Sequence, residues 1–319
     1  MPGSIDRSGP DRRIWLDGEL VPWREATVHV LSHSMQRGSL VFDYMSVHPT
    51  GRGPAIFRLP EHLERFRTST QLVGLALDRD LDALGAAVCQ TVRANPGATA
   101  LKISAYLPSV EVDVVPQDGR VAVAIAAYDP IGDVVARKGK PFAWRPELRV
   151  WVEKERRNRR RDIVEPQAKV AANYVSPMVA KARARQAGYD EVLLLDAEGH
   201  VAEGPTTNVF LVDGEGQLVT PPEEHVLHGV TRRSVLEIAK HDGRTARVET
   251  VTLDALFEAA EVFLSGTTAN VLPVVSLDGR PVGDGRPGPV SLALKARFEE
   301  IVHGRDPAFA HWLTFADEA

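Results

Sequence analysis

The sequence predicts a two-domain α+β protein with mixed sheets. Its 319 residues correspond to two domains at roughly 150 residues each. The composition, 44% hydrophobic and 25% charged, is typical of folded globular proteins. Segments with the period of strands and segments with the period of helices follow one another, interrupted by a low-periodicity stretch. We predict a polar tail at 1–13, a small N-terminal domain at 14–128, an interdomain loop at 129–140 and a larger C-terminal domain at 141–319.

The N-terminal domain is predicted to begin with a hairpin, because Asp17-Gly18 is a favoured two-residue turn between strand-forming segments. Pro60 is typical of the first turn of a helix, and apolar residues recur at helical spacing after it. The predicted elements are strand-forming segments at 14–23, 27–31 and 39–47, helices from 60 and over 81–94, and strands over 100–107 and 120–127.

The C-terminal domain is predicted to alternate strands and helices in the same way. A basic run follows its first strand, and a strand-to-helix unit surrounds residues 167–186. Strands are predicted over 148–153, 191–196, 208–212 and 260–264, and helices over 232–241 and 289–303. In such an architecture the cleft between the domains is the expected functional site.

Composition excludes several classes of function. A formal net charge of −5 gives no electrostatic reason to expect a nucleic-acid partner. Cys89 is the only cysteine, so an intrachain disulfide and a multi-cysteine metal site are excluded, and we expect no metal. The apolar runs are much shorter than the roughly 20 residues of a membrane span, and the polar start lacks the apolar core of a secretory signal. We therefore expect a cytoplasmic protein without a membrane partner.

The most conspicuous charge feature is an arginine-rich run. Interspersed acidic residues favour its interpretation as a solvated loop. The alternative is that one arginine reaches the cleft and binds a carboxylate, for which its planar fork is suited. The run consists of Arg156, Arg157, Arg159, Arg160 and Arg161.

Two turns could bind a single phosphate. Gly229-Val230-Thr231 begins a predicted helix, where free N–H groups attract an anion. The turn at 265–270, SGTTAN, follows an apolar strand and could form a second anion site. Taken alone, each is equally compatible with an ordinary cap or turn. Neither contains the longer glycine motifs of nucleotide-binding loops.

A lysine and a glutamate could supply chemistry. Only 8 of the 38 basic residues are lysines, and Lys169 lies among alanines and a valine with Tyr174 five residues later. Burial would lower the pKa of such an amine and make it nucleophilic toward carbonyls. Glu203 lies on a glycine-containing turn between two predicted strands. In isolation, these two residues could also be a strand-end lysine and a turn residue.

Five segments in order resemble one family. They are IFRLPEHLERF, PQAKVAANY, GYDEVLLLDAEGHVAEGPTTNVF, TPPEEHVLHGVTRRSV and FLSGTTANVLPV. Together they resemble the class IV aminotransferases, the fold-type IV pyridoxal-phosphate family of branched-chain and D-amino acid aminotransferases. The resemblance extends from IWLDGELVPW to HWLTF, nearly the whole chain. It implies that pyridoxal 5′-phosphate is bound in the interdomain cleft and that the protein is a homodimer.

The resemblance also implies roles for individual residues. Lys169 would bond covalently to the cofactor and carry the proton, and Glu203 would face the pyridine nitrogen. Tyr174 would hydrogen-bond the phenolic oxygen, and Leu227 would pack on the ring. The phosphate would be bound by Arg65, Val230, Thr231 and Thr267, and the substrate pocket would include Phe42, Tyr44, Ser46, Lys102 and Thr268.

The departures from the family pattern concern the substrate. Ser46 stands where bacterial branched-chain enzymes often have arginine, Thr207 where they have glutamate, and Asp43-Tyr44 where they have glutamate and glycine. The aspartate and the missing arginine are closer to the D-amino acid and (R)-amine branches, whereas HWLTF is closer to the branched-chain group.

We predict a ping-pong transfer of an amino group from a hydrophobic, branched-chain-type amino acid to a 2-oxo acid. The alternatives are a D-amino acid or (R)-amine transaminase, an aminodeoxychorismate-type lyase and a non-catalytic cofactor carrier.

Overall fold

The computed structural model describes residues 10–138, 145–268 and 270–318. It consists of two compact units, which we describe separately. The first comprises the described residues among 1–143, 170–172 and 302–319, and the second those among 144–169 and 173–301. Residues 1–9 of the predicted tail and residues 139–140 of the predicted interdomain loop lie outside the described residues.

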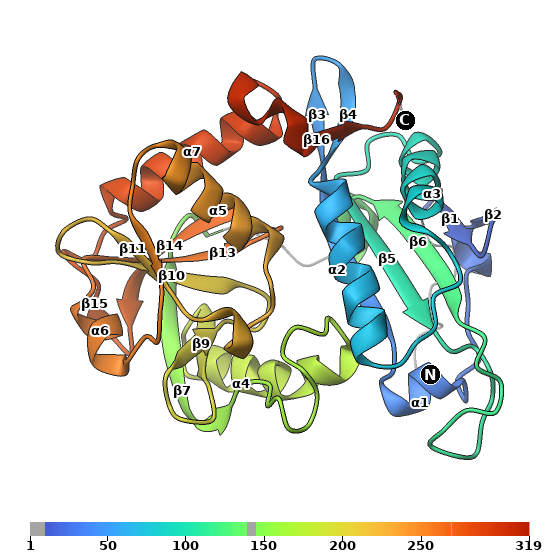
Figure 1. Ribbon diagram of the computed structural model, residues 1–319, viewed down its shortest axis with the longest axis horizontal. Coiled ribbons are helices and arrows are strands. Elements are labelled where there is room, and N and C mark those ends of the chain that lie inside the picture. Colours follow the sequence, from blue (N-terminus) through green and yellow to red (C-terminus); the bar gives the residue numbers. More distant parts are fainter. Residues whose placement is uncertain (1–9, 139–144, 269, 319) are drawn as a thin grey trace. The chain divides into compact units, whose positions relative to one another are not determined.

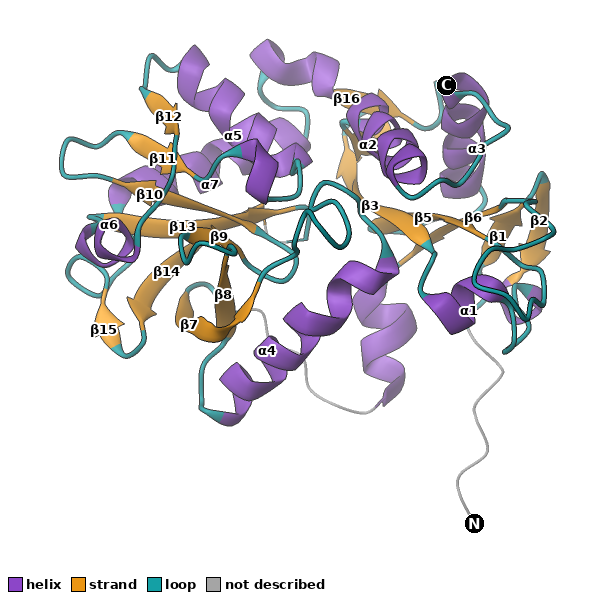
Figure 2. Cartoon of the chain, turned by 60° about the horizontal axis from the view of Figure 1, so that its bottom comes forward, coloured by secondary structure: helices purple, strands orange, loops and turns teal. Residues whose placement is uncertain are grey.

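The first unit contains a seven-stranded sheet in the order β16-β4-β3-β5-β6-β1-β2 (Figure 1). Neighbouring strands in it pair antiparallel. Figure 2 shows α2 and α3 on the same side of this sheet. The elements are β1 Arg13–Leu16, β2 Glu19–Pro22, α1 His33–Arg37, β3 Val41–Thr50, β4 Gly53–Phe57, α2 Leu59–Leu72, α3 Leu81–Arg93, β5 Ala100–Tyr106, β6 Ala122–Tyr128 and β16 Leu313–Phe315, with short helical turns at Trp23–Glu25, Pro130–Val135, Ala136–Lys138 and Pro307–Trp312.

Local chemistry accounts for several of these elements. In the β1–β2 turn, Asp17 and Gly18 both have positive φ, 50° and 117°, as the predicted hairpin turn requires. Helix α3 begins after Asp80, whose side chain accepts a hydrogen bond from the N–H of Ala83 at 2.7 Å. Both predicted helices of this unit are present. Strands β1, β2, β3, β5 and β6 match predicted segments to within three residues at their ends, whereas β4 and β16 were not predicted.

Two predicted segments of the first unit differ in the structure. Residues 27–31 form no strand, and the short helix α1 follows them. Val28, Val30 and Leu31 are at least half exposed, so their β-propensity has no sheet face to pack against. Residues 130–138, predicted as an irregular connection, form a π-helical turn followed by a 3₁₀ turn.

The second unit is built on a nine-stranded sheet in the order β12-β11-β10-β13-β14-β7-β8-β9, with β15 paired to β14. Because β9 also pairs with β10, the strands from β10 to β9 close into a ring. A buried aliphatic cluster that includes Val150, Leu193, Val209 and Leu264 fills the core. The elements are β7 Leu148–Arg157, α4 Val175–Gln186, β8 Glu191–Leu195, β9 Val201–Glu203, β10 Asn208–Val212, β11 Leu218–Thr220, α5 Val230–His241, β12 Ala246–Val248, α6 Leu253–Glu258, β13 Glu261–Gly266, β14 Asn270–Leu277, β15 Arg280–Pro281 and α7 Pro289–Val302, with 3₁₀ turns at Ala171–Tyr174 and Glu223–His225.

Helices pack on this strand ring at several places. Ala180 and Ala184 of α4 pack against Val192 and Leu194 of β8, and Figure 2 shows α4 and α5 on opposite sides of the strands. The predicted strand before Lys169 is absent, because residues 165–169 form turns and loop. None of the described helices is long and apolar enough to cross a membrane.

Candidate active site

The second unit brings Lys169 and Tyr174 together. Lys169 is 8% exposed, and its Nζ donates a hydrogen bond of 2.9 Å to Tyr174 Oη. Burial alone would raise the pKa of Tyr174, but the nearby charges of Lys169 and Arg159 outweigh it and lower that pKa below the usual phenol value. The pair therefore combines a buried amine with a phenol whose oxygen is prepared to accept hydrogen bonds.

Glu203, the last residue of β9, is 2% exposed and receives four N–H donors. Its Oε1 accepts from Arg159 Nη1 at 2.9 Å and from Asn158 Nδ2 at 3.2 Å. Its Oε2 accepts from Asn208 Nδ2 at 3.2 Å and from the backbone N–H of Leu227 at 3.1 Å. One donor is cationic, so the arrangement favours a fixed negative charge.

Arg159 connects these two groups. Its side chain is only 2% exposed, and its guanidinium carbon lies 4.9 Å from the centroid of the Tyr174 ring. The interpretation of the whole arginine run as a solvated loop is therefore wrong at this position. Arg160 and Arg161 do remain at the surface, paired with Asp162 and Glu165. Sequence alone could not select Arg159, because its partner Glu203 lies 44 residues away.

The two predicted phosphate turns both border Asn208. Val230 and Thr231 begin α5 and are buried, 4% and 3% exposed. A Cβ on Gly229, the residue that caps this helix, would overlap Asn208 Oδ1. On the neighbouring strand, Asn208 pairs with Ser265, which precedes the Gly266-Thr267 turn.

Two buried hydroxyl groups near Gly266, one of them from the β9–β10 segment, are unsatisfied within the described part of the chain. Thr207 Oγ1 and Ser265 Oγ are buried without a hydrogen-bond partner among the described residues. A Cβ on Gly266 would lie 3.1 Å from Thr207 Cγ2 and 3.2 Å from the Thr206 carbonyl oxygen, closer than ordinary packing allows. Buried polar groups are normally paired, so these hydroxyls are expected to meet a ligand. Thr267 is half-buried and Thr268 is exposed.

Arg65 lies in the first unit, on α2. Its Nε and Nη2 both donate to the Asp43 carboxylate at 2.8 Å, and His62 Nδ1 lies 2.7 Å from the same group. Burial would raise the pKa of the fully buried Asp43, but Arg65 and His62 outweigh it and hold that pKa far below its ordinary value. Asp43 therefore orients Arg65, a role that the sequence did not reveal.

Four of the predicted substrate residues, all except Thr268, share one face of the first unit's sheet. Three of them, Phe42, Tyr44 and Ser46, occupy every second position over residues 42–46 of β3, and Lys102 of β5 lies opposite Tyr44. Lys102 Nζ is 4.5 Å from the centroid of the Phe42 ring.

His48, which the sequence analysis did not single out, extends this face. Its Nε2 lies 2.8 Å from Ser46 Oγ, and its ring is 5.6 Å from that of His303. Burial, with a smaller contribution from His303, lowers the pKa of His48 to about 4, so the imidazole is neutral near pH 7.

Residues 40–277 match the amino-transferase class IV family model. The chain belongs to this family. The enzyme is 33% identical to the branched-chain-amino-acid aminotransferase of Pseudomonas aeruginosa over 97% of its own length and 98% of the relative. It is 32% identical to the Escherichia coli K12 protein of the same name, over 94% and 96% of the two chains.

Solved structures of this family have the same fold. A branched-chain amino acid aminotransferase crystallised with pyridoxamine 5′-phosphate has a TM-score of 0.88 and 36% identity, covering 96% of this chain and 99% of that one. The enzyme of Thermoproteus uzoniensis with norvaline has a TM-score of 0.86 and 33% identity, covering 96% and 99%. The predicted α+β fold class is confirmed, and the class IV aminotransferase is a pyridoxal 5′-phosphate enzyme.

The residues of the second unit fit this cofactor chemically. An aldehyde requires a nucleophilic amine, a pyridine nitrogen an anionic partner, and a phosphate several N–H and O–H donors. Lys169, Glu203 and the α5 N-terminus with its neighbouring hydroxyl groups are of these types, and Asn208 borders both Glu203 and the phosphate turns.

Proposed function

We propose that this aminotransferase moves an amino group between a hydrophobic, branched-chain-type amino acid and a 2-oxo acid. The relatives and solved structures reported above carry branched-chain names and match over at least 94% of this chain. The comparisons do not favour a D-amino acid or (R)-amine transaminase, or an aminodeoxychorismate-type lyase. A cytoplasmic location remains a prediction from the sequence.

The observation that carries the proposed mechanism is the contact between Lys169 Nζ and Tyr174 Oη. When bound, pyridoxal phosphate supplies an aldehyde for the amine and a ring that stabilises negative charge at the substrate α-carbon. In the proposal, Lys169 is the nucleophile and then carries the proton to and from that carbon. Tyr174 positions its amine and hydrogen-bonds the phenolic oxygen of the cofactor.

The other residues bind and orient. Glu203, held by four donors, is proposed to keep the pyridine nitrogen protonated, and Leu227 to pack on the ring. The phosphate is proposed to be bound by backbone and hydroxyl groups of Val230, Thr231 and Thr267, together with the guanidinium of Arg65.

The substrate side is proposed to consist of Phe42, Tyr44, Ser46, Lys102 and Thr268. With Ser46 in place of an arginine, backbone amides of Thr267 and Thr268 are the proposed partners of the substrate carboxylate, because rigid amides lose no side-chain entropy on binding. The ion pairs of Arg159, Arg160 and Arg161 with protein carboxylates weaken the alternative of an arginine clamp.

We also propose a homodimer. In the first unit, exposed apolar side chains occur on two segments, 28–35 and 110–115. A bridge between Ser32 and Val110 and the hydrogen bond from Arg37 Nη2 to the Val112 carbonyl join these parts of the chain. Such a patch is typical of a protein interface, and a second copy is the proposed occupant. The exposed residues are Val28, Val30, Leu31, Met35, Val110, Val112, Val114 and Val115. Replacing Val112, 97% exposed, by aspartate should shift sedimentation toward the monomer. An unchanged dimer would exclude this patch as the interface, and a monomeric native enzyme would contradict the homodimer.

The test of the function is a half-reaction followed through the cofactor absorption band. The purified holoenzyme is mixed with L-leucine, L-valine or L-isoleucine, their D-enantiomers, or an (R)-amine. We expect the band to bleach with the branched L-amino acids and to recover when a 2-oxo acid is added. Bleaching only by D-amino acids or (R)-amines would replace the proposal by its alternative. Pyruvate release from an aminodeoxychorismate-type substrate without an acceptor would indicate the lyase, and cofactor binding without any half-reaction would indicate a carrier.

A further inference from the structure

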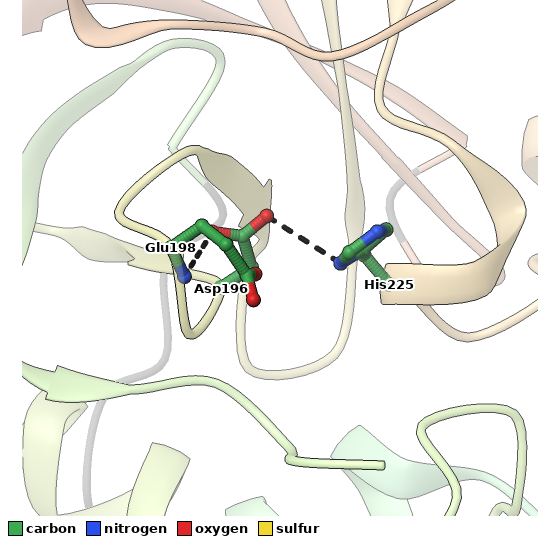
Figure 3. Close-up of side chains that lie close together, drawn as sticks. All are labelled: Asp196, Glu198 and His225. Atoms are coloured by element: carbon green, nitrogen blue, oxygen red, sulfur yellow. Dashed lines mark hydrogen bonds and ion pairs between the residues drawn. The ribbon is translucent and has the colours of Figure 1, made fainter.

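A mixed cluster of carboxylates and histidines lies in the second unit, apart from the proposed catalytic groups. The turn between β8 and β9 contributes Asp196, Glu198 and His200, and the 3₁₀ turn Glu223–His225 contributes His225. One ligand atom each of Asp196, Glu198 and His225 lies within 4.8 Å of the other two. Figure 3 shows His225 directed toward the Asp196 carboxylate from a different segment of the chain.

The spacing of these groups is that of metal ligands. His200 Nδ1 and His225 Nδ1 each lie 3.4 Å from the same oxygen, Asp196 Oδ2. This separation is longer than the roughly 2.7–3.2 Å of a normal N–H···O hydrogen bond. Zinc bonds of about 2.0–2.2 Å in a tetrahedral site place neighbouring ligand atoms roughly 3.4 Å apart. Each histidine Nδ1 therefore lies as far from Asp196 Oδ2 as two ligand atoms of one zinc ion lie from each other.

The surrounding hydrogen bonds hold these groups in place. The other carboxylate oxygen, Asp196 Oδ1, accepts the backbone N–H groups of Glu198 at 3.1 Å and His200 at 2.8 Å, which orients Oδ2 toward the histidines. On the opposite segment, the His225 carbonyl accepts from Asn158 Nδ2 at 3.3 Å. The side chains of His200 and His225 are 39% and 42% exposed, so a cation can reach them from solvent.

We propose that Asp196, Glu198 and His225 bind a divalent cation of the zinc class, with solvent as the fourth ligand. Two carboxylates and an imidazole suit this ion in ligand type, and the two negative charges balance its charge. Its role is structural, because Asn158 donates both to the His225 carbonyl and to Glu203, and Leu227, two residues further, donates to Glu203 as well. The ion fastens the segment that carries these contacts to the β8–β9 turn.

The experiment uses the holoenzyme, stripped of metal with a chelator and titrated with Zn²⁺ by calorimetry and with Co²⁺ by visible spectroscopy beyond the cofactor band. We expect one ion per chain, four-coordinate Co²⁺ bands and a Zn²⁺-dependent rise in the unfolding temperature. His225→Ala and Asp196→Asn should each weaken binding at least about 100-fold, more than the loss of a residue that only supports a ligand. The asparagine retains an oxygen for the two backbone N–H groups, so the turn should persist.

His241→Ala is the matched control, because His241 is an exposed histidine paired with Asp242 at 3.0 Å on another part of the second unit. It should leave binding and the Zn²⁺-dependent rise unchanged. Absence of stoichiometric binding, or binding that survives His225→Ala or Asp196→Asn, would overturn the site. His200→Ala should weaken binding less than His225→Ala does, and an equal loss in the two variants would overturn the three-ligand arrangement.

Discussion

The buried ion pair between Arg159 and Glu203 predicts a large effect of Arg159→Met on stability. The two side chains are 2% and 3% exposed. Removing one partner of such a pair typically costs about 3–5 kcal/mol, because the other charge is left buried without its counter-ion. Glu203 would keep the N–H donors of Asn158, Asn208 and Leu227. We therefore expect the lower end of that range, a loss of about 3 kcal/mol in the free energy of unfolding.

The assay is urea unfolding of the apoenzyme, since the affinity for the cofactor then makes no contribution to stability. Arg159→Met should lower the midpoint while leaving the slope unchanged. Arg160→Met is the matched control on the next residue. Its partner Asp162 is exposed, and solvent screens such surface pairs, so little change is expected.

A double mutant separates the ion pair from other effects of the substitution. Glu203→Gln removes the negative charge, so adding it to Arg159→Met should cost much less than it does in the native background. We expect a coupling free energy of at least about 2 kcal/mol between the two positions, within the range seen for contacting residues. Equal losses in Arg159→Met and Arg160→Met, or strictly additive effects in the double mutant, would refute this reasoning.

Three further predictions follow from the same geometry. Borohydride reduction and peptide mapping should locate the cofactor on Lys169, and Lys169→Ala should abolish the covalent bond; a label on another lysine would contradict the assignment. Glu203→Gln should lower the transamination rate roughly 10²-fold or more, by loss of charge stabilisation, and a near-native rate would mean that Glu203 does not face the ring. The folded-state pKa of His48, about 4, lies below its unfolded value of about 6.5. The unfolded state therefore binds more protons between pH 6.5 and pH 4, and stability should fall by up to about 3 kcal/mol as the pH is lowered through this window. Parallel pH–stability curves for the native enzyme and His48→Asn would contradict this predicted contribution of His48.

The sequence predicted the elements whose signals are local. The Asp17-Gly18 hairpin, the helix with Pro60 in its first turn, the helix after Asp80 and the helix that begins after Gly229 depend on turn chemistry, capping and periodicity within a few residues. The strand prediction for residues 27–31 was wrong. Strand propensity reflects how well a side chain fits a half-buried sheet surface, and these residues have no such surface to pack against.

The candidate site was only partly predictable for a related reason. Lys169 and Tyr174 lie close in sequence as well as in space. The partners of Glu203, by contrast, come from segments up to 45 residues away, and His225 lies 29 residues beyond Asp196 with no spacing motif to connect them. Arg159 is surrounded by arginines that look equivalent until the fold distinguishes one of them.

Side chains along β3 point alternately to the two faces of the sheet, and this weakens the use of Asp43 as an indicator of the substrate class. Asp43 was interpreted as a feature of the D-amino acid and (R)-amine branches. In the structure it faces α2, where it binds Arg65 and His62, whereas Phe42 and Ser46 lie on the opposite face of the sheet because successive strand residues alternate. A residue buried on the helix side can alter the orientation of Arg65, but it lies away from the face that carries the proposed substrate residues. The contacts of Asp43 are thus accounted for by Arg65 and His62, and in the proposed site the residues to vary in a test of L against D donors are those on the face that carries Ser46.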